Sequence, residues 1–226
     1  MDALAFGLRG WAGTIAGFLN WRIDQVIMGL ITTEAALGYY AVAVNAADVA
    51  LYLPSAVAVA IVPSIARSGG VERITTTLRV FRALLLMTAG VVAIGFACSP
   101  LIPVVFGSTY QPSVEPFLML LPGAIALMPL VIFPNALFAS SAPGLSTSGP
   151  IAALLVGVAL DFILVPPFGA TGAAIATTVA LLVGAIVSTL TYIHVTRIDP
   201  RMLVPGRGDV AFIGSLGRRL LGRSEA

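Results

Sequence analysis

The stretch Asn20-Trp21-Arg22-Ile23-Asp24-Gln25 lies between two apolar runs, Ala12 to Leu19 and Val26 to Ile31. The chain around it has 226 residues, of which 58% are hydrophobic and only 10% are charged. Soluble domains contain about 25% charged residues, so lipid must cover part of this apolar surface. A charge at the bilayer centre costs about 2.5–3.5 kcal/mol on insertion scales. The stretch is therefore expected to face a polar path between helices of an all-α, polytopic membrane protein.

Six segments are long and apolar enough, or nearly so, to span a bilayer, which takes about 20 helical residues. They are residues 3–31, 35–66, 77–97, 113–140, 150–165 and 170–195. The last two are joined by the tight turn Pro166-Pro167-Phe168-Gly169, after which small residues predict close helix packing. We therefore expect one six-helix transmembrane domain over residues 1–196 and an Arg-rich cytoplasmic tail over residues 197–226.

The arginines predict the orientation of these helices. They are concentrated in the loop after the second segment and in the tail, at positions 67, 73, 79, 82, 197, 201, 207, 218, 219 and 223. With six spans both regions fall on one side, and arginine-rich loops remain in the cytoplasm. Both termini are therefore expected to be cytoplasmic. The net charge of +2 is spread along membrane edges and forms no patch for nucleic acid.

Arg22 has a predicted partner in the second segment. The two segments meet near Thr33, so Arg22 lies about level with residues 40–45, and Asp48 lies one turn nearer the cytoplasm. Side chains lean toward the N-terminus of their own helix, which brings Arg22 toward Asp48. The sequence therefore predicts an Arg22–Asp48 pair.

The other polar residues of these segments form two facing stripes. Asn20 and Asp24 share a helix face, and Gln25 lies on the next one, while Asn45 and Asp48 lie three apart on the second segment. The stripes have two interpretations. They hold the hairpin together by interhelical hydrogen bonds, or they line a water-filled cavity in which Arg22 attracts an anionic group such as a phosphate.

Other reactive side chains predict no chemistry. Glu115 is expected near the outer interface, and Asp161 is expected to have a structural or interfacial role. Cys98 is expected to be buried, and His194 is expected to be interfacial or structural. No second histidine, nucleotide-binding loop or Ser/His/Asp set is present in the sequence. We therefore expect no enzymatic activity, no metal site and no cofactor.

Four stretches resemble a known family. They are FLNWRIDQVIMG (18–29), ALGYYAVAVNAADV (36–49), PLIPVVFGSTYQPSVEPFLMLLPG (100–123) and DFILVPPFGATGAAIATT (161–178). In this order they resemble the second half of bacterial polysaccharide and O-antigen flippases of the multidrug/oligosaccharidyl-lipid/polysaccharide exporter superfamily. The resemblance implies polysaccharide biosynthesis, including lipopolysaccharide, at the cytoplasmic (inner) membrane.

It also implies a transporter of two six-helix lobes that moves a polyprenyl-diphosphate-linked oligosaccharide across the bilayer. Arg22, Asp24 and Asp48 would then line a cavity and meet the lipid diphosphate. Only one lobe is found here, so the partners expected are the lipid bilayer, the lipid-linked oligosaccharide and a second lobe, either a missing N-terminal half or another chain. Two alternatives remain open, namely a drug or cation antiporter lobe of the same superfamily and a non-transporting membrane scaffold subunit.

Overall fold

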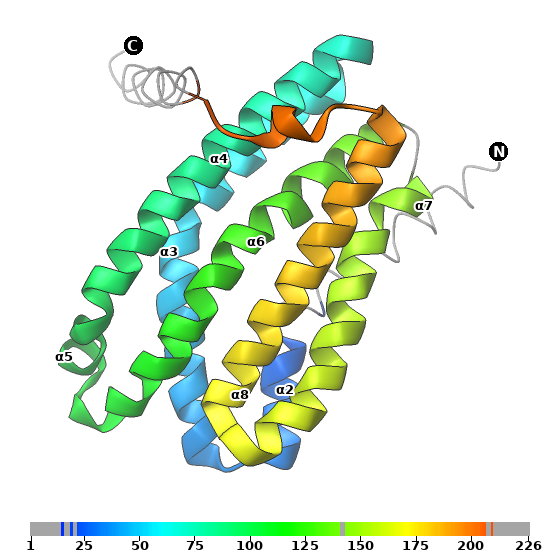
Figure 1. Cartoon of the computed structure of the whole chain (residues 1–226). Coiled ribbons are helices and arrows are strands. Elements are labelled where there is room, and N and C mark those ends of the chain that lie inside the picture. Colours follow the sequence, from blue (N-terminus) through cyan, green and yellow to red (C-terminus); the bar gives the residue numbers. More distant parts are fainter. Residues whose placement is uncertain (1–14, 16–18, 20–21, 141–142, 207–208, 210–226) are drawn as a thin grey trace.

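The computed structural model describes residues 15, 19, 22–140, 143–206 and 209. These residues form α-helices and short 3₁₀ helices, without any strand among them. The helices are α2 (Ile23–Ile31), α3 (Glu34–Arg67), α4 (Gly70–Cys98), η1 (Ser99–Leu101), α5 (Ile102–Phe106), η2 (Ser108–Ser113), α6 (Val114–Ala139), α7 (Pro143–Ser146), α8 (Ser148–Thr196) and η3 (Pro200–Leu203). They lie side by side as one bundle (Figure 1). The expected all-α fold is confirmed.

Three described segments are long and apolar enough to cross a membrane, namely Gly70–Phe106, Ser108–Ala139 and Gly144–Thr196. The last contains α8, whose 49 residues would extend about 74 Å as a straight helix, more than twice the hydrocarbon thickness. Gly169 interrupts α8 with φ 54° and ψ −127°, and the chain turns back there (Figure 1). The predicted turn is confirmed, and α8 is a hairpin of two antiparallel limbs. The chain is thus an all-α membrane protein.

Small residues bring the two limbs of α8 into close contact. A Cβ atom on Gly149 would lie 1.8 Å from Ser188 Oγ, and one on Gly184 would lie 2.8 Å from Ala153 Cβ. At the bend, a Cβ atom on Gly172 would lie 2.1 Å from the carbonyl oxygen of Leu164. The limbs approach this closely because these glycines carry no side chain, which is how helices pack in lipid without a hydrophobic driving force.

Helix α6 packs against α3, α4 and α8 and is the centre of the bundle. Its Phe133 is fully buried between Phe81 of α4 and Tyr192 of α8, with ring centroids 4.8 and 4.6 Å away. Pro122, Pro129 and Pro134 lie inside α6, which nevertheless continues to Ala139. Neighbouring helices that surround α6 on several sides allow such proline-containing helices at membrane depth.

Two expectations need correction. Helix α4 begins at Gly70, seven residues before the predicted start, because Arg73 donates hydrogen bonds to the carbonyls of Ser68 (2.9 Å) and Ala139 (2.8 Å). These bonds order the first turns of α4 against the end of α6. Cys98, expected to be buried, is exposed at the last position of α4.

The segment after α8 lies across α4 (Figure 1). Arg82 of α4 donates to the carbonyl of Met202 at 3.1 Å and forms an ion pair with Asp209, with 3.1 Å between Nε and Oδ2. The division into residues 1–196 and 197–226 stays a prediction. Most of the first predicted segment and all of the tail beyond Asp209 lie outside the described residues.

Candidate functional site

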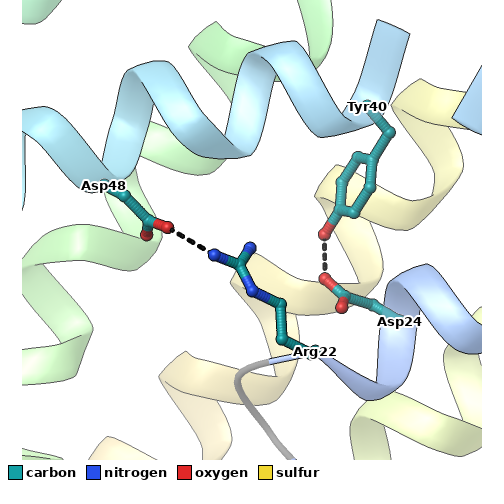
Figure 2. A network of polar contacts seen from close by, with 4 residues as sticks. All are labelled: Arg22, Asp24, Tyr40 and Asp48. Carbon is teal, nitrogen blue, oxygen red and sulfur yellow. Dashed lines mark hydrogen bonds and ion pairs between the residues drawn. The ribbon is translucent and has the colours of Figure 1, made fainter. Parts of the chain in front are cut away.

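Arg22 and Asp48 form an ion pair across the first hairpin (Figure 2). Arg22 immediately precedes α2 and Asp48 lies in α3, and 3.2 Å separates Arg22 Nη2 from Asp48 Oδ2. The hairpin closes at Thr33, whose hydroxyl accepts a hydrogen bond from the Ala36 amide at 3.3 Å. The predicted pair is thus confirmed. The Arg22 side chain remains 45% exposed and that of Asp48 17% exposed, so the guanidinium is held in place but can still be reached.

Asp24 faces the interior of the bundle. Its carboxylate is buried and accepts hydrogen bonds from the Tyr40 hydroxyl, the Gln25 amide (2.8 Å) and Thr177 Oγ1 (3.5 Å). Tyr40 is fully buried, and its hydroxyl also lies 3.0 Å from Thr177 Oγ1. Figure 2 shows Arg22 and Asp24 making separate contacts on α3. This agrees with their spacing of two residues, which cannot share a helix face.

A third carboxylate lies in this part of the bundle. Asp161, in the first limb of α8, is only 2% exposed, which favours the structural over the interfacial role expected for it. It is four residues after Gly157, where an added Cβ atom would lie 3.3 Å from Ala180 Cβ in the second limb, so the two share a helix face. Its Oδ1 atom has no hydrogen-bond partner among the described residues.

Asp24, Tyr40, Asp48 and Thr177 border a cavity of about 290 Å³ between α2, α3, α6 and α8. Its lining residues are Asp24, Tyr40, Val44, Ala47, Asp48, Leu51, Leu120, Ala124, Leu127, Leu130, Val131, Pro150, Thr177 and Leu181. Four of these residues carry polar side chains and the others are apolar. A cavity of this size is at the small end of ligand sites, and it suits a molecule with a charged head and an apolar body.

The other predicted site residues lie elsewhere. Gln25 is half-buried, and Asn45 is exposed and does not line this cavity. Asn20 lies outside the described residues. Of the stripe expected on α3, only Asp48 therefore reaches the cavity, while a role for Gln25 and Asn45 stays a prediction.

Tyr40 and Thr177 were missed by the reasoning from sequence. The depth count that pairs Arg22 with Asp48 also places Tyr40 near the level of Asp24, so this signal was available for Tyr40. Thr177 is 153 residues away from Asp24 in the chain, and no local pattern connects the two.

A family model described as "polysaccharide biosynthesis protein" matches residues 1–115. The match includes Arg22, Asp24, Tyr40 and Asp48 and ends at the start of α6. No curated protein and no solved structure matches the chain. The family match covers just over half of the 226 residues, and the apolar helices place the chain in a membrane. The chain therefore belongs to this family of polysaccharide biosynthesis proteins, as a membrane-embedded member.

Proposed function

We propose that this chain is one six-helix lobe of a flippase, which moves a polyprenyl-diphosphate-linked oligosaccharide across the cytoplasmic membrane. The observation that carries the proposal is the half-exposed Arg22, which pairs with Asp48, a residue that lines a cavity with mainly apolar walls. The family match supports a role in polysaccharide biosynthesis. A lipid diphosphate has the matching chemistry, because its head is anionic and its tail is apolar.

Arg22 is suited to recognise this head group. A guanidinium binds phosphate oxygens through two parallel hydrogen bonds, which a lysine ammonium cannot do. The Arg22–Asp48 pair is partly exposed, and such pairs contribute only about 0–1 kcal/mol. A diphosphate therefore competes with Asp48 at small cost, and the ion pair keeps the guanidinium oriented while the site is empty of substrate.

The proposal also places the chain in the inner membrane with a second six-helix lobe as its partner. Arginines of the α3–α4 loop and of the tail favour cytoplasmic termini in the inner membrane. A second six-helix lobe, in the same polypeptide or another chain, completes the transport path by rocking against this one. The lobe needs no catalytic group, because translocation breaks no covalent bond.

The test is binding of a fluorescent polyprenyl diphosphate to the purified chain in detergent. We expect Arg22→Ala to weaken binding about 10- to 150-fold, because a hydrogen bond to a charged group contributes about 1.5–3 kcal/mol. Arg22→Lys should recover only part of the affinity. Arg67→Ala, which removes an exposed arginine at the end of α3, is the matched control and should bind as the wild type does. Equal affinity in wild type and Arg22→Ala rejects the assignment of Arg22.

A drug or cation antiporter lobe is the second candidate, favoured by the acidity of the site. Two carboxylates, those of Asp24 and Asp48, line the cavity, and Asp48 pairs with the Arg22 guanidinium. The same preparation distinguishes the two functions. Binding of tetraphenylphosphonium that is lost in Asp24→Asn, without binding of polyprenyl diphosphate, supports the antiporter and rejects the flippase.

A further inference from the structure

A second cavity, of about 550 Å³, lies at the end of the bundle where the α2–α3 turn and the bend of α8 come together (Figure 1). Its walls come from the start of α3, from η2, from the first turns of α6 and from the bend of α8. The volume is within the usual range of ligand sites, which is about 300–1,000 Å³. In the proposed orientation this end of the bundle faces the outside of the cell, so we call this the outer cavity and the one bordered by Asp48 the inner cavity.

The outer cavity is distinct from the inner one. Tyr39 lines the outer cavity and Tyr40 lines the inner one, so the two open on neighbouring faces of α3. Among the residues that the structure describes, the two cavities share no lining residue. Asp48, the partner of Arg22, lies about 14 Å farther along the helix axis than Tyr39. A ligand group in the outer cavity therefore leaves the Arg22–Asp48 pair untouched.

Three polar side chains border the outer cavity, namely Gln111, Glu115 and Thr171. Gln111 and Glu115 are exposed, and Thr171 is half-buried. Within the described part of the chain, none of the three side chains forms a hydrogen bond, so all are free to bind a ligand. The amide and the hydroxyl each donate and accept, and the carboxylate accepts. This set matches the hydroxyl groups of a sugar, which bind a carboxylate through strong charge-assisted hydrogen bonds.

Two aromatic rings also line the outer cavity. Phe168, next to the bend at Gly169, is 60% exposed. Tyr39 is half-buried, and its ring packs edge-on against Tyr110, with centroids 6.2 Å apart and an angle of 87° between the planes. The faces of aromatic rings are partly negative and attract the partly positive C–H bonds of a sugar ring. A lipid acyl chain is a poor occupant, because it would leave the three polar groups without water or a partner.

The charge of the outer cavity restricts the kind of sugar. Among the described residues that line it, Glu115 alone carries a charge. The sequence contains no arginine or lysine in residues 23–66 or 83–196, which include every segment that lines the cavity. A phosphate or a uronic acid placed here would meet a charge of the same sign. The cavity is therefore suited to an uncharged saccharide and unsuited to the diphosphate.

We propose that the outer cavity binds an uncharged saccharide, whose ring packs on Phe168 and Tyr39 and whose hydroxyl groups bond to Gln111, Glu115 and Thr171. The source of the saccharide rests on the proposed function, in which it is the glycan of the lipid-linked substrate. The structure then separates recognition of the two parts of the substrate, with the glycan in the outer cavity and the diphosphate at Arg22.

The experiment measures binding of lipid-free saccharides to the purified full chain by saturation-transfer NMR, in a detergent without a sugar head group. The probes are neutral disaccharides of glucose, galactose, mannose and N-acetylglucosamine, together with matching disaccharides that contain a uronic acid. We expect a neutral probe to bind with a dissociation constant of about 1 mM, because an open site buries little ligand surface. Its uronic acid counterpart should bind about 5-fold more weakly. Failure of every neutral probe to bind, or preference for the uronic acid, overturns the proposal.

Two substitutions connect the binding to the outer cavity. Phe168→Ala should weaken binding of the neutral probe about 3- to 10-fold, because it removes an aromatic face. Phe162→Ala removes a similarly exposed ring from the same limb of α8, outside the cavity lining, and should bind as the wild type does.

Glu115→Gln keeps the shape of the side chain and removes its charge. It should weaken binding of the neutral probe about 5-fold and abolish the discrimination against the uronic acid. An acidic residue in the first turn of a helix also stabilises that helix, but this role affects Tm and not the preference between probes. Glu72→Gln, an exposed residue in the first turn of α4, is the matched control. Wild-type binding in both Phe168→Ala and Glu115→Gln overturns the site.

The same variants separate this proposal from the flippase proposal. Arg22→Ala should leave binding of the lipid-free probe unchanged, and Phe168→Ala should leave binding of sugar-free polyprenyl diphosphate unchanged. Diphosphate binding without saccharide binding overturns the outer site and leaves the flippase proposal in place. Saccharide binding without diphosphate binding supports the outer site and rejects the lipid-linked glycan as its ligand. A lipid-linked oligosaccharide that carries the bound sugar should displace the probe, and failure to displace it also rejects that glycan.

Discussion

Replacement of Gly172 by alanine tests the close packing at the bend of α8. The new Cβ atom would lie 2.1 Å from the carbonyl oxygen of Leu164 and 2.6 Å from its carbonyl carbon, where ordinary contacts begin at 3.4 Å. Both of these are backbone atoms, so no rotation of a side chain relieves the overlap. The two limbs must move apart by roughly 1 Å, which corresponds to severe overpacking.

The cost can be estimated by comparison with an unobstructed glycine. Overpacking costs about 1–3 kcal/mol, whereas alanine in a helix is favoured over glycine by about 0.5–1 kcal/mol. Gly172→Ala should therefore destabilise the protein by about 1–2 kcal/mol and lower Tm by about 2–8 °C for a chain of this length. Gly90→Ala, in the middle of α4 with no atom within 4 Å of the new Cβ, should leave Tm unchanged or raise it.

The assay is thermal unfolding of the purified chain in detergent, followed by far-UV circular dichroism. The quantity of interest is the difference in Tm between Gly172→Ala and Gly90→Ala, since both substitutions add one methyl group. A difference of less than 1 °C would show that the limbs of α8 separate without cost. The packing described for this hairpin would then be incorrect.

Three further predictions concern the pair, the core and the orientation. Arg22→Asp and Asp48→Arg should each destabilise the protein, and the double variant should recover about 0.5–1 kcal/mol of unfolding free energy in a double-mutant cycle. A coupling energy of zero would show that the two side chains do not interact in the folded protein. Phe133→Ala should lower the free energy of unfolding by about 3–5 kcal/mol, because it empties the space between two aromatic rings. Phe162→Ala, at a 56% exposed position, should change Tm little. Similar Tm losses in both variants would contradict the buried position of Phe133. Cys98 should react with a membrane-impermeant maleimide in intact cells, because the proposed orientation places that end of α4 outside the cell. Labelling only in permeabilised cells would show that the orientation is the opposite one.

The sequence predicted the helices well because apolar runs and proline-glycine turns are local signals. The bend at Gly169 follows from Pro166-Pro167-Phe168-Gly169, and the Arg22–Asp48 pair follows from counting residues on either side of the turn near Thr33. The start of α4 was predicted too late, because its first turns are polar and are held by Arg73.

The interior of the site was less predictable. Distance along a helix gives the depth of Asp161 but not the direction in which it points. Gly157, a small residue four positions earlier that packs against the second limb, would have indicated the face on which Asp161 lies. The contact between Asp24 and Thr177 depends on how α2 packs against α8, and no local pattern contains that information.

The three prolines of α6 have a mechanical consequence. Each removes the amide that would bond the carbonyl four residues earlier, so α6 lacks three of its own hydrogen bonds at Pro122, Pro129 and Pro134. A helix that lacks backbone hydrogen bonds bends more easily than an intact one, and kinks in helices concentrate at proline. Since α6 contacts α3, α4 and α8, bending of α6 displaces all three neighbouring helices together. Helix α6 thus combines three interior prolines with contacts to three long neighbouring helices.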